Sequence, residues 1–298
     1  MRSFSSIARF TAREILSDPL SLLLTLAAAA VAFTGSVMHC HQFGEASRMA
    51  RDASFSAILT GGILFSVFCT VKTVRCEFES STLEMVLSHP VGRIRFFMAK
   101  TTGSVMALAV FLFTLSCLSL TIVRGAWIGG ETALEKGDVA SMWGPSAALA
   151  FAAFTLPLAF AAALNRAKGT RFVLAAMRTM PVLAAASVVY RFDCAFVARH
   201  APGLVLLFFP PIVFAAAAAA FSMRFGSGMA AFASIVLFAA AVPALGNYCL
   251  SNALSGGGTI PWRYVALAAA AAAPAVACFL AAGAWAADSV ETEGEKGI

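Results

Sequence analysis

The feature that most constrains this chain is a series of eight apolar stretches, each about as long as a bilayer is thick. They lie at about 19–38, 55–74, 101–123, 145–165, 172–190, 204–222, 229–247 and 264–286. A transmembrane helix needs roughly 20 mostly apolar residues. Only 12% of the 298 residues are charged, about half the share in soluble domains. So few charges cannot cover a globule in water, and the sequence predicts an all-α, polytopic membrane helix bundle that forms one domain over residues 1–298.

The number of spans depends on residues 204–247. This stretch fits two spans that turn at "MRFGSG", or one kinked helix followed by a buried outer segment. Pro210 and Pro211 would bend the helix in either case, because proline lacks a backbone N–H. We favour two spans here and about eight in all, with six as the alternative.

Residues 1–18, before the first apolar stretch, have the pattern of an amphipathic helix. One helical face carries Phe4, Ile7, Ala8, Thr11 and Ile15, whereas Arg9 and Arg13 lie elsewhere. This pattern predicts a helix that lies in the membrane surface on the cytoplasmic side. A signal peptide is the competing interpretation, but no small-x-small cleavage site closes the apolar run that follows.

The distribution of Lys and Arg predicts the orientation of the chain. With the N-terminus inside, the inner segments hold 13 of the 21 basic residues and the outer segments hold 7. Positive residues favour the cytoplasmic side, so both termini and the tail at 288–298 are expected there. All four Trp and all three Tyr lie at or near expected span ends, as in aromatic belts. Topology therefore accounts for the net charge of +6, and no nucleic-acid partner is expected.

A polar insert, "EFESSTLEMVLSHPVGR" at residues 77–93, interrupts the apolar chain. Ser81 and Glu84 form a capping box that starts a helix directly after Ser81. Pro90 disfavours helical backbone in the residue before it, so this helix should end near Ser88. About seven residues span roughly 10 Å, which is too short to cross a bilayer. The insert is therefore expected in the cytoplasm as a short helix.

Leu83 and Leu87 lie one turn apart on this helix and form an apolar stripe. Recognition of a helix in a groove requires such a stripe on an accessible helix. The insert can therefore be a docking element for a cytoplasmic partner. An ordinary cytoplasmic loop with a capped turn explains the same residues, and their spacing leaves both interpretations open.

The segment "EFESSTLEMVLSHPVGRIRFFMAK" resembles the coupling-helix segment of ABC type-2 permeases, the membrane subunits of one class of ATP-binding-cassette transporters. That family shows E-x-E-x-x-T-[LI]-x-x-[LV]-L-S-[KRH]-P-V-x-R, then an apolar run and G-K. The matching positions are Glu77, Glu79, Thr82, Leu83, Val86, Leu87, Ser88, Pro90, Val91, Arg93 and Lys100. The departures are His89, where Lys or Arg is commoner, Arg95, where the family has acidic or neutral residues, and Ala99, which replaces Gly.

Weaker similarities follow in the expected order along the chain. "IARFTAREILSDPLSLLL" looks like the N-terminal surface helix, and "AALNRAKGTRFVLAA" looks like the basic turn between the fourth and fifth spans. "VPALGNYCLSNALSGGGTIPWRYVALAAA" looks like the external segment before the last span. The resemblance thus extends over most of the chain.

The resemblance implies that residues 77–93 dock in a cleft of a separate ABC ATPase subunit and transmit its closure to the spans. The implied coupling residues are Glu77, Glu79, Thr82, Leu83, Glu84, Val86, Leu87, Ser88, Pro90, Val91 and Arg93. The chain has no G-x-x-x-x-G-K-[ST] phosphate loop, so we expect ATP and Mg to be bound by the partner and no cofactor by this chain. The resemblance also implies the bacterial cytoplasmic (inner) membrane and a dimer with a second copy or a sister permease.

Few other residues suggest chemistry. Arg178 lies about two turns into the stretch at 172–190; it either snorkels to the cytoplasmic end or pairs with a neighbouring helix, or it contacts substrate or gates the path. "HCH" at 39–41 is expected to be a plain external loop, because adjacent side chains rarely converge on one ion. The seven cysteines show no CxxC and no recurrent spacing. We expect no metal site, no catalytic residues and no enzymatic activity in this chain.

Two further functional classes compete with a permease. A secondary transporter is expected to carry acidic or other ionisable residues within its spans, whereas the expected spans contain no Asp or Glu. A membrane scaffold or assembly protein would recruit a cytoplasmic partner through the same insert without moving a substrate. The sequence alone does not separate the scaffold from the permease.

Overall fold

The computed structural model describes residues 2–37, 46–79, 92–136, 145–190, 192–246 and 259–294, and every regular element in these ranges is an α-helix. The helices are α1 (Arg2–Leu16), α2 (Pro19–Val37), α3 (Ala46–Glu79), α5 (Arg93–Lys136), α6 (Pro145–Lys168), α7 (Phe172–Tyr190), α8 (Cys194–Leu206), α9 (Phe209–Arg224), α10 (Ser227–Gly246) and α12 (Trp262–Gly294). The prediction of an all-α bundle is confirmed.

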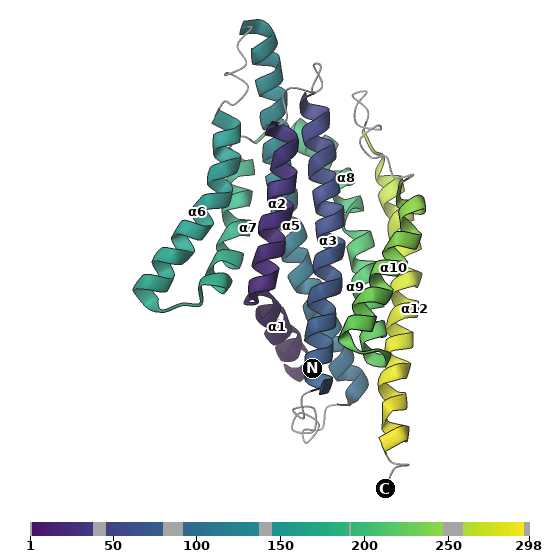
Figure 1. Ribbon diagram of the computed structural model, residues 1–298. Coiled ribbons are helices and arrows are strands. Elements are labelled where there is room, and N and C mark those ends of the chain that lie inside the picture. The colour runs from purple at the N-terminus through teal and green to yellow at the C-terminus, as the bar shows by residue number, and fades with distance from the viewer. Residues whose placement is uncertain are drawn as a thin grey trace.

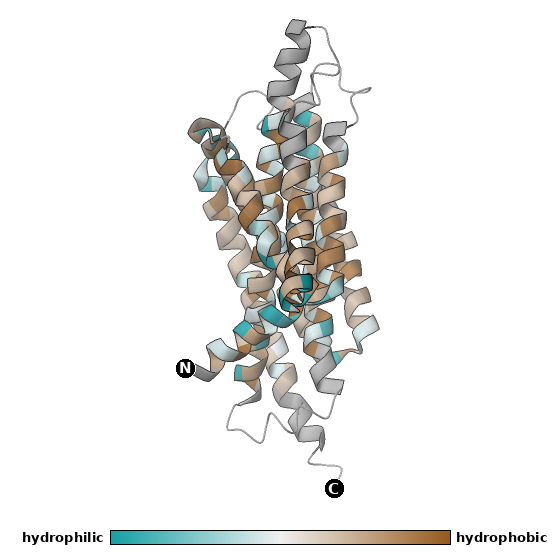
Figure 2. Ribbon diagram, turned by 90° about the vertical axis from the view of Figure 1, so that its left-hand side faces the viewer, coloured by the Kyte–Doolittle hydropathy of each residue, from teal (hydrophilic) through white to brown (hydrophobic). Residues whose placement is uncertain are grey.

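The long helices stand side by side in an upright bundle (Figure 1). The short helix α1 lies at the lower end of the bundle, and the pair α6–α7 leans away from the remaining helices (Figure 1). The chain starts and ends at this same lower end. Hydrophobic residues dominate the middle of the bundle, whereas hydrophilic residues become commoner toward its two ends (Figure 2).

Within the described ranges, five helical segments are long and apolar enough to cross a membrane. They are Arg48–Val74, Ile94–Ala126, Phe172–Tyr190, Cys194–Arg224 and Trp262–Ala287. A sixth results if Phe4–Leu16 and Pro19–Thr34, which meet at an angle of 62°, are counted as one broken span. The chain is therefore a multi-pass membrane protein by the length and composition of its helices.

Several helices extend well beyond the apolar stretches that predicted them. The helix expected at 101–123 occupies 93–136, and the last helix continues to Gly294, into the tail expected from residue 288. Hydropathy marks only the part of a helix that fits lipid, whereas helical hydrogen bonding continues into water wherever the residues allow it. Hydropathy therefore predicted the positions of these two helices correctly but underestimated their lengths.

The stretch expected at 204–222 belongs to a longer segment, Cys194–Arg224, which is broken between α8 and α9. Pro210 and Pro211 cannot donate to the carbonyl groups four residues earlier, and α8 accordingly ends at Leu206. The next turn, between α9 and α10, falls within "MRFGSG", where the turn between two spans was expected. The apolar part of α10 in the described residues, Ser227–Ala240, is shorter than the five spanning segments.

The core of the bundle lies around α3, where two adjacent glycines permit close helix approach. A Cβ atom added at Gly61 would lie 2.9 Å from Cβ of Ala28 in α2. A Cβ atom at Gly62 would lie 2.9 Å from side-chain atoms of both Leu112 in α5 and Pro211 in α9. One turn further on, the ring of Phe65 in α3 stacks on a ring of α5, Phe111, with a centroid distance of 4.4 Å.

Candidate functional site

The polar insert connects α3 to α5, two helices that pack against each other and meet it at the lower end of the bundle (Figure 1). Glu77 and Glu79 lie in the last turn of α3, and Arg93 is the first residue of α5. The other expected coupling residues, Thr82, Leu83, Glu84, Val86, Leu87, Ser88, Pro90 and Val91, lie outside the described residues. The structure thus brings the two ends of the insert to one end of the bundle.

The helix α1 packs against the first turns of α5, directly after the insert. The side chains that it buries are Ala8, Thr11, Ala12 and Ile15. Part of the face expected to meet lipid is therefore covered by protein, whereas Phe4 and Phe10 remain exposed. Periodicity identified an apolar face, but it could not distinguish burial in lipid from burial against a neighbouring helix.

Two ion pairs connect α1 and the turn after it to the helices on either side of the insert. Lys72 Nζ in α3 lies 2.6 Å from Asp18 Oδ2, which belongs to the turn between α1 and α2. Lys100 Nζ in α5 lies 3.6 Å from Glu14 Oε2 in α1 and 5.8 Å from the ring centroid of Phe96. The side chain of Lys100 is only 4% exposed. The sequence gives no local signal for these pairs, because each joins residues that are far apart in the chain.

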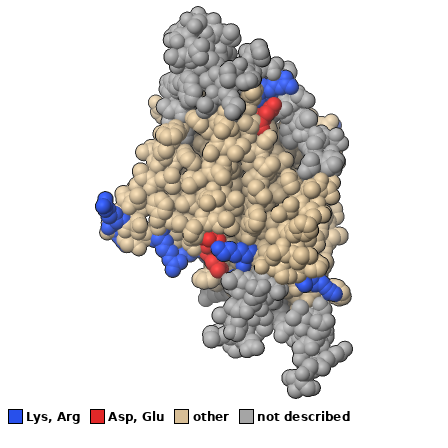
Figure 3. All heavy atoms as spheres, in the orientation of Figure 1, with Lys and Arg blue, Asp and Glu red and all other residues tan. Residues whose placement is uncertain are grey.

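Positive charge gathers at this same end of the molecule, along the lower edge of a largely uncharged surface (Figure 3). The exposed basic residues of the lower helix ends are Arg9, Arg13, Lys72, Arg95, Arg166, Lys168, Arg171 and Arg224. Arg224 also lies 5.2 Å from the ring centroid of Trp285 in α12. The insert therefore joins the bundle at its more basic end.

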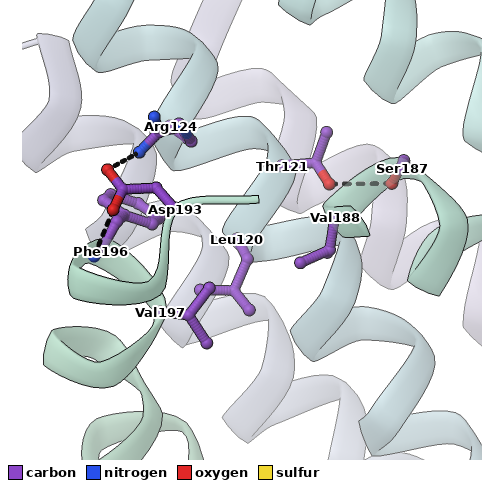
Figure 4. Close-up of a pocket in the computed structure, with 8 residues that line it drawn as sticks. All are labelled: Leu120, Thr121, Arg124, Ser187, Val188, Asp193, Phe196 and Val197. Atoms are coloured by element: carbon purple, nitrogen blue, oxygen red, sulfur yellow. Dashed lines mark hydrogen bonds and ion pairs between the residues drawn. The ribbon is translucent and has the colours of Figure 1, made fainter. Parts of the chain in front are cut away.

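A second cluster lies toward the other end of the bundle from the insert, where α5 contacts the start of α8 (Figures 1 and 4). Arg124 Nη1 lies 2.6 Å from Asp193 Oδ2, and the guanidinium carbon lies 5.3 Å from the ring centroid of Phe196. Asp193 also caps α8 by accepting hydrogen bonds from the backbone N–H groups of Ala195 and Phe196. The hydrogen bond from Arg124, supported by that from Phe196 N–H, holds the pKa of the Asp193 carboxyl below its ordinary value.

Beside this ion pair, the hydroxyl groups of Thr121 and Ser187 lie 2.9 Å apart and connect α5 to α7 (Figure 4). The hollow between the two contacts has a volume of about 20 Å³, enough for about one water molecule. The cluster joins α5 to the end of α7 and the start of α8. An aspartate directly before an apolar helix is an N-cap signal, and this signal could have identified Asp193.

Arg178 is exposed on α7, while Leu174, Met177 and Ala184 are among the residues that this helix buries. Among the described residues, Arg178 is not one of those that form the Arg124 cluster. Within the described ranges, no group of three His, Cys, Asp or Glu side chains could hold a metal ion. Residues 39–41 lie outside these ranges.

No protein-family model, curated protein or solved structure matches this chain. A functional proposal therefore depends on the chain's own residues and their arrangement.

Proposed function

We propose that this chain is the membrane-spanning permease subunit of an ABC type-2 transporter. It would move a substrate across the bacterial cytoplasmic membrane, with a separate ATPase subunit that binds ATP and Mg. The observation that supports this proposal most is the sequence of residues 77–93, with its capping box, apolar stripe and terminating proline. It connects α3 to α5 at the end of the bundle where exposed Lys and Arg gather.

In this proposal the insert is the coupling helix, and α3 and α5 transmit its movement to the rest of the bundle. The two helices contain 34 and 44 residues and pack along each other through close contacts such as Phe65 on Phe111. Because close-packed helices move as bodies rather than bending, a push on the insert displaces both lower ends. ATPase closure would thereby switch the bundle between two discrete arrangements.

The remaining features of the proposed subunit follow from the same family. The permease has about eight spans, a surface helix at α1 and cytoplasmic termini, and it works with a second copy or a sister permease. Three helices of the expected eight, α2, α6 and α10, lie outside the five segments of sufficient length and apolarity within the described residues, and α2 qualifies only together with α1 as a broken span. A scaffold that recruits a cytoplasmic partner through the same insert is the alternative, and it differs from the permease in having no coupled ATPase.

The test is to purify the full-length chain in detergent and identify what it retains from its own cells. We expect an ABC ATPase to copurify, and we expect the chain to stimulate ATP hydrolysis after joint reconstitution. In the Leu83→Asp/Leu87→Asp variant, stimulation should be lost, because a charged stripe cannot bind an apolar groove without a large desolvation penalty. Membrane insertion should be unchanged.

Met85→Asp is the control, since it adds one of the two negative charges to the same short helix but on a neighbouring face. It should retain most of the stimulation. Stimulation that survives in the double variant would show that the insert is not the coupling element. Copurification of an unrelated protein, with no ATPase, would contradict the permease proposal and support the scaffold.

A further inference from the structure

The first turns of α5 are in contact with α1 through a glycine. A Cβ atom added at Gly103 would lie 2.6 Å from the backbone oxygen of Ala8 and 2.6 Å from Cβ of Thr11. Rotating a side chain cannot relieve a clash with backbone, so a larger residue here must push α1 away from α5. Gly103 therefore sets the distance between these two helices.

The ion pairs described above attach the other end of α1 to the same region. Glu14 contacts Lys100 of α5, and Asp18 contacts Lys72 of α3. Each pair joins one largely buried side chain, Lys100 or Asp18, to one that is about half exposed. Solvent therefore screens both pairs in part.

The two lysines occupy equivalent places relative to the insert. Lys72 lies about two turns before the end of α3, and Lys100 lies about two turns after the start of α5. The segment from α1 to the following turn thus contacts both helices that carry the insert, close to the points where they leave the bundle (Figure 1). When the insert moves either of these helices, it therefore also strains the contacts of that helix with α1 or with the turn that follows α1.

We propose that α1 is a brace, meaning a helix that holds the lower ends of α3 and α5 at a fixed separation so that the insert moves both together. Gly103 and Lys100 are the positioning residues of this brace. The inference rests on the proposed function, because it gives α1 a part in passing ATPase closure to the membrane helices. It assigns to α1 a mechanical role that is separate from contact with the bilayer.

The test uses the full-length chain with Gly103→Leu, and with Gly228→Leu as the matched control. A Cβ atom at Gly228, in the first turn of α10, meets nothing within 4 Å. The position of α1 is followed by acetylation of lysines and mass spectrometry, because Lys100 is buried beneath α1 whereas Lys168 is exposed. We expect Lys100 to become several-fold more reactive relative to Lys168 in Gly103→Leu and to remain protected in Gly228→Leu.

The functional measurement uses the same proteins with the copurifying ATPase. Gly103→Leu should still bind the ATPase, since its insert is intact, but stimulation of ATP hydrolysis should fall roughly fivefold. The ion pair provides a second route in case Gly103→Leu fails to fold. Lys100→Glu should reduce stimulation, and Glu14→Lys/Lys100→Glu should recover most of it.

Three results would overturn the proposal. Normal stimulation in a Gly103→Leu protein whose Lys100 has become reactive refutes the brace while leaving the permease in place. Unchanged protection of Lys100 in that variant shows that Gly103 does not set the position of α1. A wild-type chain that neither binds nor stimulates an ATPase refutes the proposed function, and the coupling role of α1 with it.

Discussion

At the scale of the residue, Asp193 illustrates how one carboxylate can serve two elements. It caps α8 through two backbone N–H groups and binds Arg124 of α5 at 2.6 Å. Both contacts favour the ionised form, so the pKa of Asp193 lies below its ordinary value. Stability contributed by a carboxyl with a lowered pKa is complete above the unfolded-state pKa of about 4 and is lost as the pH falls through the folded-state pKa.

Asp193→Asn should therefore lower the melting temperature near neutral pH, because it removes the charge that binds Arg124 while leaving an oxygen to cap α8. Thermal unfolding in detergent from about pH 7 to about pH 2 measures this effect. The difference between wild type and variant should shrink toward acid pH. Arg124→Gln should remove the same pH-dependent part, and a difference that stays constant with pH would show that the ion pair does not stabilise the fold.

At the scale of the element, the sequence predicted where helices lie more accurately than where they end or what they touch. Apolar length located the central part of α5, but not its extension to Lys136. Pro210 and Pro211 indicated a bend, and α8 does end shortly before them. The glycines of α3 carry no such signal, because an apolar run gives no indication of which glycine faces a neighbouring helix.

Gly61→Leu should destabilise the bundle by about 1–3 kcal/mol, because added atoms in a packed interface must displace α2 from α3. Gly228→Leu makes the same chemical change where no atom lies within 4 Å of the new Cβ, and we expect it to change stability little. Thermal unfolding of both variants in the same detergent makes the comparison. Equal melting temperatures for the two variants would contradict close packing at Gly61.

At the scale of the whole molecule, the two ends of the bundle differ both in positive charge and in which helix ends they contain. The helix bundle begins and ends at its lower end, where the described exposed Lys and Arg gather and where α3 and α5 meet the insert (Figures 1 and 3). From the positive-inside rule we expect this end to face the cytoplasm. An ATPase that acts on the insert requires this orientation.

The orientation can be tested with single cysteines at His89→Cys and Gly256→Cys, in a background that lacks the seven natural cysteines. A membrane-impermeant maleimide should label position 256 on intact spheroplasts. Position 89 should react only after lysis. Labelling of both positions from one side, or the reverse pattern, would contradict the proposed orientation.

The sequence by itself determined the class of fold, the placement of most helices and the polar insert at 77–93. These depend on local properties, namely apolar length, charge, capping residues and proline. Only the tertiary structure decided that α1 packs on Gly103, that Glu14 and Asp18 meet Lys100 and Lys72, and that Arg124 meets Asp193. Such contacts depend on how each helix is rotated and tilted against its neighbours. In a membrane that geometry is set by side-chain packing between helices. Hydropathy along the chain carries no information about this packing.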